Sequence, residues 1–134
     1  PRIMANGTIA FDTLTTSDQA KSGTEKSVDT SYIYNGVTKA WLSFDGTSTA
    51  HIDDSLNFST VTDDGTGDYA ITFTNAMNSA DYSHTNGAAS PSGQSFGIRQ
   101  PNNMSTTQVS FETYYATTQA DFANVSSAIH GDLA

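Results

Sequence analysis

The chain contains no cysteine, which excludes disulfides, thiolate catalysis and zinc–sulfur sites. Positive charge is also scarce, because five Lys and Arg face 14 Asp and Glu over 134 residues, a formal net charge of −9. Without a basic run, neither nucleic acid nor an anionic membrane surface is an expected partner. No apolar run approaches the roughly 18 residues that a transmembrane helix needs, so membrane insertion is not expected either.

Residues that favour helices are scarce as well, and residues that favour strands and turns take their place. The chain has 12 Asp but only two Glu, three Lys, and 17 Ser with 20 Thr. Thr and the aromatic residues favour strands, whereas Asp and Ser favour turns and caps. The length is that of one domain. We therefore expect a single all-β domain over 1–134 rather than a helical bundle or an α/β enzyme.

Alternation of apolar and polar residues places the expected strands. The segment 31–34 is expected to end in a hairpin turn at Asn35-Gly36, and Leu56 and Phe58 are expected to share a face. The full set of expected strand segments is 8–14, 31–34, 37–44, 56–61, 69–74, 80–84, 108–115 and 121–132. Short strands with turn signals at regular intervals predict an antiparallel β-sandwich, either jelly-roll-like or Ig-like.

Large apolar residues on the inward faces of these strands define the expected core. Trp41 lies on the face opposite Leu42 and Phe44, so it either fills the second layer of a sandwich or contacts a neighbouring subunit. A ligand-stacking role for Trp41 would require it to be exposed. The residues expected to pack are Trp41, Leu42, Phe44, Phe58, Tyr69, Ile71 and Phe73.

Two segments resemble a known family. Residues 36–47 contain Lys39-Ala40-Trp41-Leu42-Ser43-Phe44-Asp45-Gly46-Thr47, and residues 52–74 run from Ile52-Asp53-Asp54-Ser55 to Asp63-Asp64-Gly65-Thr66-Gly67-Asp68-Tyr69 and Thr74. Together they resemble a β domain of tail fibres and related structural proteins of tailed bacteriophages and prophages. That family combines a K-A-W-aliphatic-x-F-[DN]-G-T strand with a hairpin that ends in T-D-x-G-T-G-D-Y. The opening segment 7–14 and the closing segment 125–132 resemble its flanking strands.

The resemblance implies a homotrimeric virion β domain without enzymatic activity or cofactor. A tail-fibre role would make the host cell-surface polysaccharide or protein a partner, together with other virion proteins. Two alternatives stay open: a capsid or head decoration or fibre protein, and a monomeric carbohydrate-binding or Ig-like module. Segment 5–30 is expected to pack between subunits, and residues 1–4 are interpreted as an N-terminal remnant.

The unmatched region 78–105 is rich in Asn, Ser and Gly, a composition that suits adaptable recognition of polar surfaces such as glycans. Tyr82 and His84 share a face beside it. Tyr114 and Tyr115 are neighbours on one strand, so one of them must face solvent or a partner. These four residues are the candidates for receptor binding.

Two further patterns carry chemistry in other proteins. Residues 93–97 fit the G-x-S-x-G nucleophile elbow, but the prolines on either side disfavour the strand–turn–helix that the elbow needs, so no catalytic residue is predicted. Asp63, Asp64 and Asp68 could offer oxygen ligands to calcium, but they lack EF-hand spacing, and a turn is the favoured interpretation.

The three histidines are the remaining candidate ligands. His51, His84 and His130 have no ligand spacing, and a structural or interface role is expected for them. No metal site is predicted.

Overall fold

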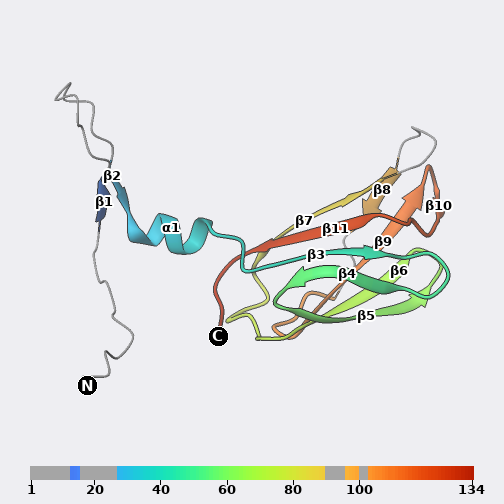
Figure 1. Cartoon of the computed structure of the whole chain (residues 1–134), viewed down its shortest axis with the longest axis horizontal. Coiled ribbons are helices and arrows are strands. Elements are labelled where there is room, and N and C mark those ends of the chain that lie inside the picture. Colours follow the sequence, from blue (N-terminus) through green and yellow to red (C-terminus); the bar gives the residue numbers. More distant parts are fainter. Residues whose placement is uncertain (1–12, 16–26, 90–95, 100–102) are drawn as a thin grey trace, which may run out of the picture. The chain divides into compact units, whose positions relative to one another are not determined.

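The computed structural model describes residues 13–15, 27–89, 96–99 and 103–134 (Figure 1). The chain divides into two compact units, residues 1–37 and 38–134. No helix among the described residues is long and apolar enough to cross a membrane.

The described part of the first unit is a two-stranded ribbon followed by one short helix. Strands β1 (Thr13–Thr15) and β2 (Ser27–Asp29) pair antiparallel, with Leu14 opposite Val28. Helix α1 spans Thr30–Gly36. Of the predicted strand 8–14, the first five positions lie outside the described residues.

The strand predicted over 31–34, with a hairpin turn at Asn35-Gly36, is wrong, because these residues lie in α1. Asp29 is the N-cap, and its side chain accepts a hydrogen bond from the Ser31 backbone N–H at 2.8 Å. At the other end, the Val37 N–H donates to the Ile33 carbonyl at 3.1 Å. Local capping therefore satisfies backbone groups that a strand would have to pair with a distant segment.

The second unit consists of two antiparallel sheets, so the all-β prediction is confirmed. In the first sheet the strand order is β4–β3–β11–β7, and in the second it is β10–β9–β6–β5, with β8 also paired to β9. The strands are β3 (Ala40–Asp45), β4 (His51–Leu56), β5 (Phe58–Gly65), β6 (Asp68–Phe73), β7 (Ser83–Ala88), β8 (Phe96–Arg99), β9 (Gln108–Tyr115), β10 (Thr118–Gln119) and β11 (Val125–His130).

The predicted alternation holds along the central strands. In β3, Ala40, Leu42 and Phe44 point inward, and in β11 the inward positions are Val125 and Ile129 with Ser127 between them. Strand β9 alternates in the same way. The strand predicted over 80–84 overlaps β7 only at its start, since β7 begins at Ser83.

The prediction that Leu56 and Phe58 share a face is wrong, because the chain changes sheets between them. Leu56 ends β4 in the first sheet and is 48% exposed, whereas Phe58 begins β5 in the second sheet and is buried. Asn57 takes a left-handed φ of 60° at the crossing. Its side chain accepts a hydrogen bond from the Asn75 backbone N–H at 2.7 Å, which fixes the crossing in place.

Aromatic rings join the two sheets. Phe44 of the first sheet contacts Tyr69 and Phe111 of the second, at ring-centroid distances of 5.0 and 5.9 Å. Six of the residues expected to pack lie in this core: Leu42, Phe44, Phe58, Tyr69, Ile71 and Phe73. Trp41 does not, because it points away from the second layer and is 37% exposed.

The two segments that carry the family resemblance meet at one point in the structure. The Tyr69 hydroxyl donates to the Asp121 carboxylate at 2.8 Å and lies 3.2 Å from the Gly46 carbonyl oxygen. A Cβ at Gly46 would lie 2.3 Å from that hydroxyl, so only glycine fits there. The same Asp121 oxygen accepts the Gly67 N–H at 2.6 Å. Burial, followed by the neighbouring Asp121, raises the pKa of Tyr69, so the hydroxyl keeps its proton.

Tyr69→Phe should lower the free energy of unfolding by about 1–3 kcal/mol, because it removes a buried hydrogen bond to a carboxylate. Chemical denaturation monitored by circular dichroism measures the change. Tyr32→Phe, the same substitution at a highly exposed position of α1, is the control and should shift the midpoint little. Equal shifts for the two variants would contradict the role assigned to the Tyr69 hydroxyl.

Candidate functional site

A polar groove of about 570 Å³ lies on the outer face of the second sheet. Its walls come from β5, β6 and β9 and from the segment before β9. In the ladder between β6 and β9, Asp68 lies opposite Glu112 and Ala70 lies opposite Ser110. The lining residues are Asp64, Asp68, Ala70, Asn103, Gln108, Ser110 and Glu112.

Strand alternation explains why these side chains gather. In β9, Val109, Phe111 and Thr113 fill the core, so the residues between them must point outward. Ala70, the small outward residue of β6, leaves the middle of the groove hollow.

Tyr114 continues the outward row of β9 beyond Glu112. Its hydroxyl donates to the Glu112 carboxylate at 2.5 Å. One of the four receptor-binding candidates therefore belongs to the same face as the groove. Its contact orients Glu112 and places an aromatic ring beside the acidic end.

The groove is rich in hydrogen-bond acceptors. Burial, then the charge of Glu112 and then that of Asp64, raise the pKa of the Asp68 carboxyl above its ordinary value. Such a surface accepts hydrogen bonds from hydroxyl or ammonium groups and repels phosphate, sulfate and carboxylate. The chemistry points to neutral or amino-bearing polar ligands.

The three aspartates considered for calcium are divided between two roles. Asp63 accepts the Gly65 backbone N–H at 3.1 Å and so caps the turn between β5 and β6, whereas Asp64 and Asp68 line the groove. Gly67 completes this turn with φ 68°, and a Cβ there would lie 2.5 Å from the Thr113 carbonyl oxygen. In the part of the chain that the structure describes, no cluster of three or more His, Asp and Glu side chains could hold a metal ion.

Tyr82 lies in the core rather than on the surface. It is 6% exposed, and its ring packs edge-on against Phe73. Its hydroxyl donates to the carbonyls of Ser105 and Gln108 at 3.1 and 3.2 Å, and burial raises its pKa to about 12. Tyr82 therefore holds the turn that leads into β9 and positions Gln108 at the groove, without itself facing a ligand.

His84 is half-buried and faces inward from β7. Its ring packs against Phe111 at 5.7 Å, its Nε2 lies 2.8 Å from the Ser127 hydroxyl, and its Nδ1 lies 3.3 Å from the Asn86 amide nitrogen. Burial lowers the pKa of His84 to about 4. Ser127 is 4% exposed, and His84 and Asn86 are half-buried, so this Ser–His–Asn group is a structural network at the edge of the core.

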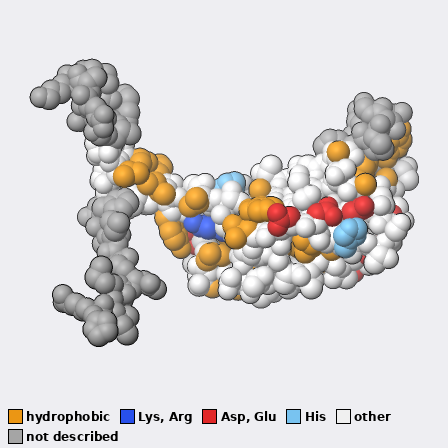
Figure 2. All heavy atoms as spheres, viewed as in Figure 1, with side chains coloured by type: hydrophobic (Ala, Val, Ile, Leu, Met, Phe, Trp, Pro, Cys, Tyr) orange, Lys and Arg blue, Asp and Glu red, His pale blue; other side chains and the backbone are white. Residues whose placement is uncertain are grey.

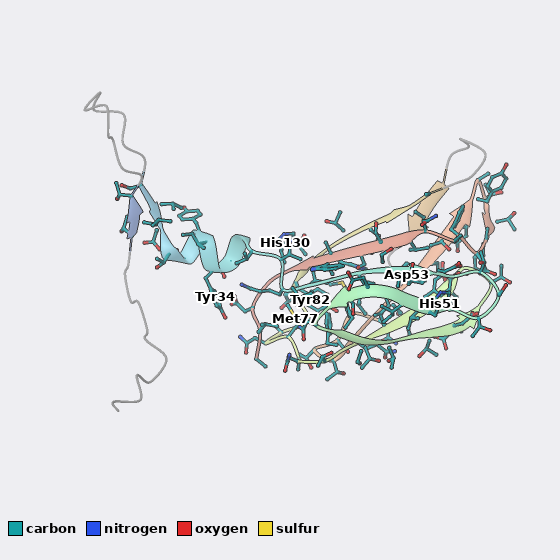
Figure 3. The ribbon with its side chains drawn as sticks, in the orientation of Figure 1. Tyr34, His51, Asp53, Met77, Tyr82 and His130 are labelled. Atoms are coloured by element: carbon teal, nitrogen blue, oxygen red, sulfur yellow. The ribbon has the colours of Figure 1, made fainter. Side chains whose placement is uncertain are left out.

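The remaining histidines lie apart from one another. His51 faces Asp53 across 3.5 Å on the exposed strand β4, and His130 contacts Thr38 at 3.1 Å (Figure 3). Tyr115 lies 36% exposed at the end of β9, and its register partner is Thr118 of β10. The structure thus does not bring Tyr82, His84, Tyr114 and Tyr115 together into one site.

A second exposed patch lies on the outer face of the first sheet. Trp41 is opposite Leu56 on one side and Ala128 on the other. Hydrophobic, acidic and histidine side chains follow one another over β3 and β4 in Figure 2. The patch lies on the first sheet and the groove on the second, so the two surfaces are on opposite faces of the sandwich.

The G-x-S-x-G pattern lies mostly outside the described residues, which begin again at Phe96. From that residue the chain forms strand β8, whereas a nucleophile elbow needs a helix after the serine. Sequence reasoning missed the groove itself. The sequence does contain half of the pattern, because polar residues alternate with core residues over 108–112. Which residues of β6 lie beside them is known only from the pairing of β6 with β9.

His84 should make stability depend on pH between 6.5 and 4. The fold lowers its pKa from the ordinary 6.5 to about 4, so the unfolded chain binds the proton more tightly. Stability from His84 is therefore complete above pH 6.5 and falls by up to about 3 kcal/mol as the pH drops to 4. Denaturation midpoints of the wild type and His84→Gln at pH 7 and 4.5 measure this.

His51→Gln, which removes an exposed histidine, is the matched control and should keep the wild-type pH dependence. Identical pH dependence in the wild type and His84→Gln would show that the ring is not held in its neutral form by the core.

The groove and the Trp41 patch are two surfaces of the described residues on which a function can be argued. A scan against protein-family models, a search of curated proteins and a search of solved structures each gave no significant match.

Proposed function

We propose that this chain is a non-enzymatic β domain of a bacteriophage virion structural protein of the tail-fibre type, which attaches to host-surface glycan through the outer face of β5, β6 and β9. The observation that carries the proposal is the acceptor-rich groove with Asp68 opposite Glu112. The resemblance of segments 36–47 and 52–74 to phage tail-fibre domains supplies the biological setting, the surface of a virion.

The proposal extends to the finer fold and to assembly. A jelly-roll-like or Ig-like arrangement is supported by the long-range strand order, in which the last strand, β11, lies between β3 and β7. A homotrimer is the assembly that the family resemblance implies. The three grooves of one trimer would bind a polysaccharide with repeating units with far higher avidity than a single groove would.

Sugar recognition in the groove rests on hydroxyl groups of the glycan. These groups donate to the carboxylates of Asp64, Asp68 and Glu112, while the amides of Asn103 and Gln108 both donate and accept. The Tyr114 ring offers a stacking surface for an apolar sugar face. The negative charge selects neutral or amino sugars over uronic acids and phosphorylated polymers.

One alternative has its own supporting observation. The unit 38–134 has a core of its own, as expected of a module that folds and binds as a monomer. A monomeric carbohydrate-binding module would use the same groove, so it differs from the tail-fibre proposal in assembly rather than in ligand. A capsid-decoration protein would differ in lacking glycan binding.

Ser110→Leu should weaken glycan binding at least about tenfold, because the larger side chain fills the groove without changing its charge. Isothermal titration of the full chain with soluble oligosaccharides from host-surface polysaccharide measures this, and Glu112→Gln should lower the affinity as well.

The matched control is Ser126→Leu, the same substitution on the outer face of the other sheet, which should bind as the wild type does. Absence of binding to neutral, amino-bearing and acidic oligosaccharides alike would refute the adhesin proposal and favour capsid decoration. If Ser110→Leu and Ser126→Leu lowered the affinity for oligosaccharide equally, the groove would not be the binding site.

A further inference from the structure

The outer face of the first sheet carries two neighbouring rows of side chains that run across its four strands. The pairing of β4, β3, β11 and β7 fixes both rows, because residues directly opposite each other share a face. The apolar row consists of Leu56, Trp41, Ala128 and Thr85, and the polar row consists of Asp54, Ser43, Ser126 and Gly87. Alternate residues of a strand lie about 7 Å apart, so one extended ligand can contact both rows.

The apolar row presents an aromatic platform. Trp41 is 37% exposed, and Leu56, its register partner on β4, is 48% exposed. Adjoining large apolar side chains on a surface are typical of contact sites, whereas single ones are not. Among the side chains, the indole ring of tryptophan is also the one whose face binds cations best.

Small residues leave a hollow beside this platform. Its volume is about 330 Å³, and its lining residues are Ser43, Gly87, Ala88, Ala89, Asn124, Val125 and Ser126. Three of these residues belong to the polar row, so the hollow adjoins the apolar row directly. Serine hydroxyls and the asparagine amide supply hydrogen-bond acceptors there. The surface therefore offers a ring to lie on and, one row away, a polar space to fill.

The charge around the two rows is acidic. Asp54 is exposed at the end of the polar row, and the side chain of Asp53 next to it is 47% exposed. Lys39, two residues before Trp41, is only 8% exposed. The unit 38–134 carries ten acidic and two basic side chains, a net charge of −8. A cation is the group that complements an exposed indole flanked by carboxylates.

A second copy of the chain does not fit this surface well. Strand β4 lies at the edge of the first sheet and, among the described residues, pairs with β3 alone. Its two central residues are Asp53 and Asp54, so another β4 added antiparallel in full register would place carboxylates of the two copies opposite each other. Like charges in that position are destabilising, and charges on an edge strand guard against self-pairing. The charge therefore favours a different protein as the occupant.

We propose that the two rows form a docking site for an arginine-bearing extended segment of a different protein. One guanidinium lies over the Trp41 ring with its charge beside Asp54, and the next side chain on the same face of the segment enters the hollow at Ser126. Arginine suits this place because its planar group stacks on aromatic faces and pairs with carboxylates. Side chains two residues apart in an extended segment have the same spacing as the two rows. Figure 2 shows the hydrophobic and acidic side chains side by side over β3 and β4.

The fluorescence of Trp41 tests the proposal, because the chain has no other tryptophan. The full chain is titrated with an acetylated and amidated hexapeptide of alternating arginine and serine, and separately with the glutamate–serine counterpart. The arginine peptide should change the Trp41 emission in a saturable manner, with an affinity that falls as the salt concentration rises. The glutamate peptide should leave the emission unchanged.

Two pairs of variants locate the binding site. Ser126→Leu fills the hollow without changing the charge and should weaken arginine-peptide binding at least about tenfold, whereas the matched Ser110→Leu on the other sheet should bind as the wild type does. Asp54→Asn keeps an acceptor for the Ser55 backbone N–H and should weaken binding about two- to fivefold. Asp81→Asn, which neutralises an exposed carboxylate outside both rows, is its control and should have no effect.

Absence of a saturable change in Trp41 emission with the arginine peptide would overturn the proposal. Failure of acrylamide to quench Trp41 in the peptide-free full chain would overturn it too, since another part of the chain or a second copy would then cover the ring. Equal weakening by Ser126→Leu and Ser110→Leu would show that only the overall charge holds the peptide. No glycan enters this titration, so its result is independent of the proposed function.

Discussion

The hydrogen bond from Tyr69 to Asp121 is the contact on which the rest of the sandwich depends. It joins the turn after β3, the hairpin before β6 and the segment before β11, which are far apart in the sequence. Because the Asp121 carboxylate also accepts the Gly67 N–H, one side chain fixes both the hairpin and the ring position. The lack of a Cβ at Gly46 allows the Tyr69 hydroxyl to approach so closely.

Strand β6, which begins beside the Tyr69–Asp121 contact, has a different role on each face. Tyr69, Ile71 and Phe73 point into the core and hold the sheets together, while Asp68 and Ala70 point outward into the groove. A change in register between β6 and β9 would therefore move the core and the groove at once. The rigidity that packing gives to β6 and β9 is what holds the carboxylates in a fixed arrangement, and loops alone would not do this.

Much of the fold could be predicted because it depends on local alternation, as in 69–73, 108–115 and 125–130. Alternation failed where another local effect was stronger. The cap at Asp29 made 30–36 a helix, and Asn57 moved the chain from one sheet to the other. The site could not be predicted, because Asp68 and Glu112 meet only through the pairing of β6 with β9. Tyr82 was expected near a receptor, but its hydroxyl is used by carbonyls from a distant turn.

If glycan binds to the outer face of β5, β6 and β9, backbone amide chemical shifts should change on that face during titration of the full chain with a host-surface oligosaccharide. We expect shift changes at Asp64, Asp68, Ser110 and Glu112 that saturate together, with the Trp41 indole signal unchanged. Changes centred on Trp41 and Leu56, or none at the groove residues on saturation, would contradict it.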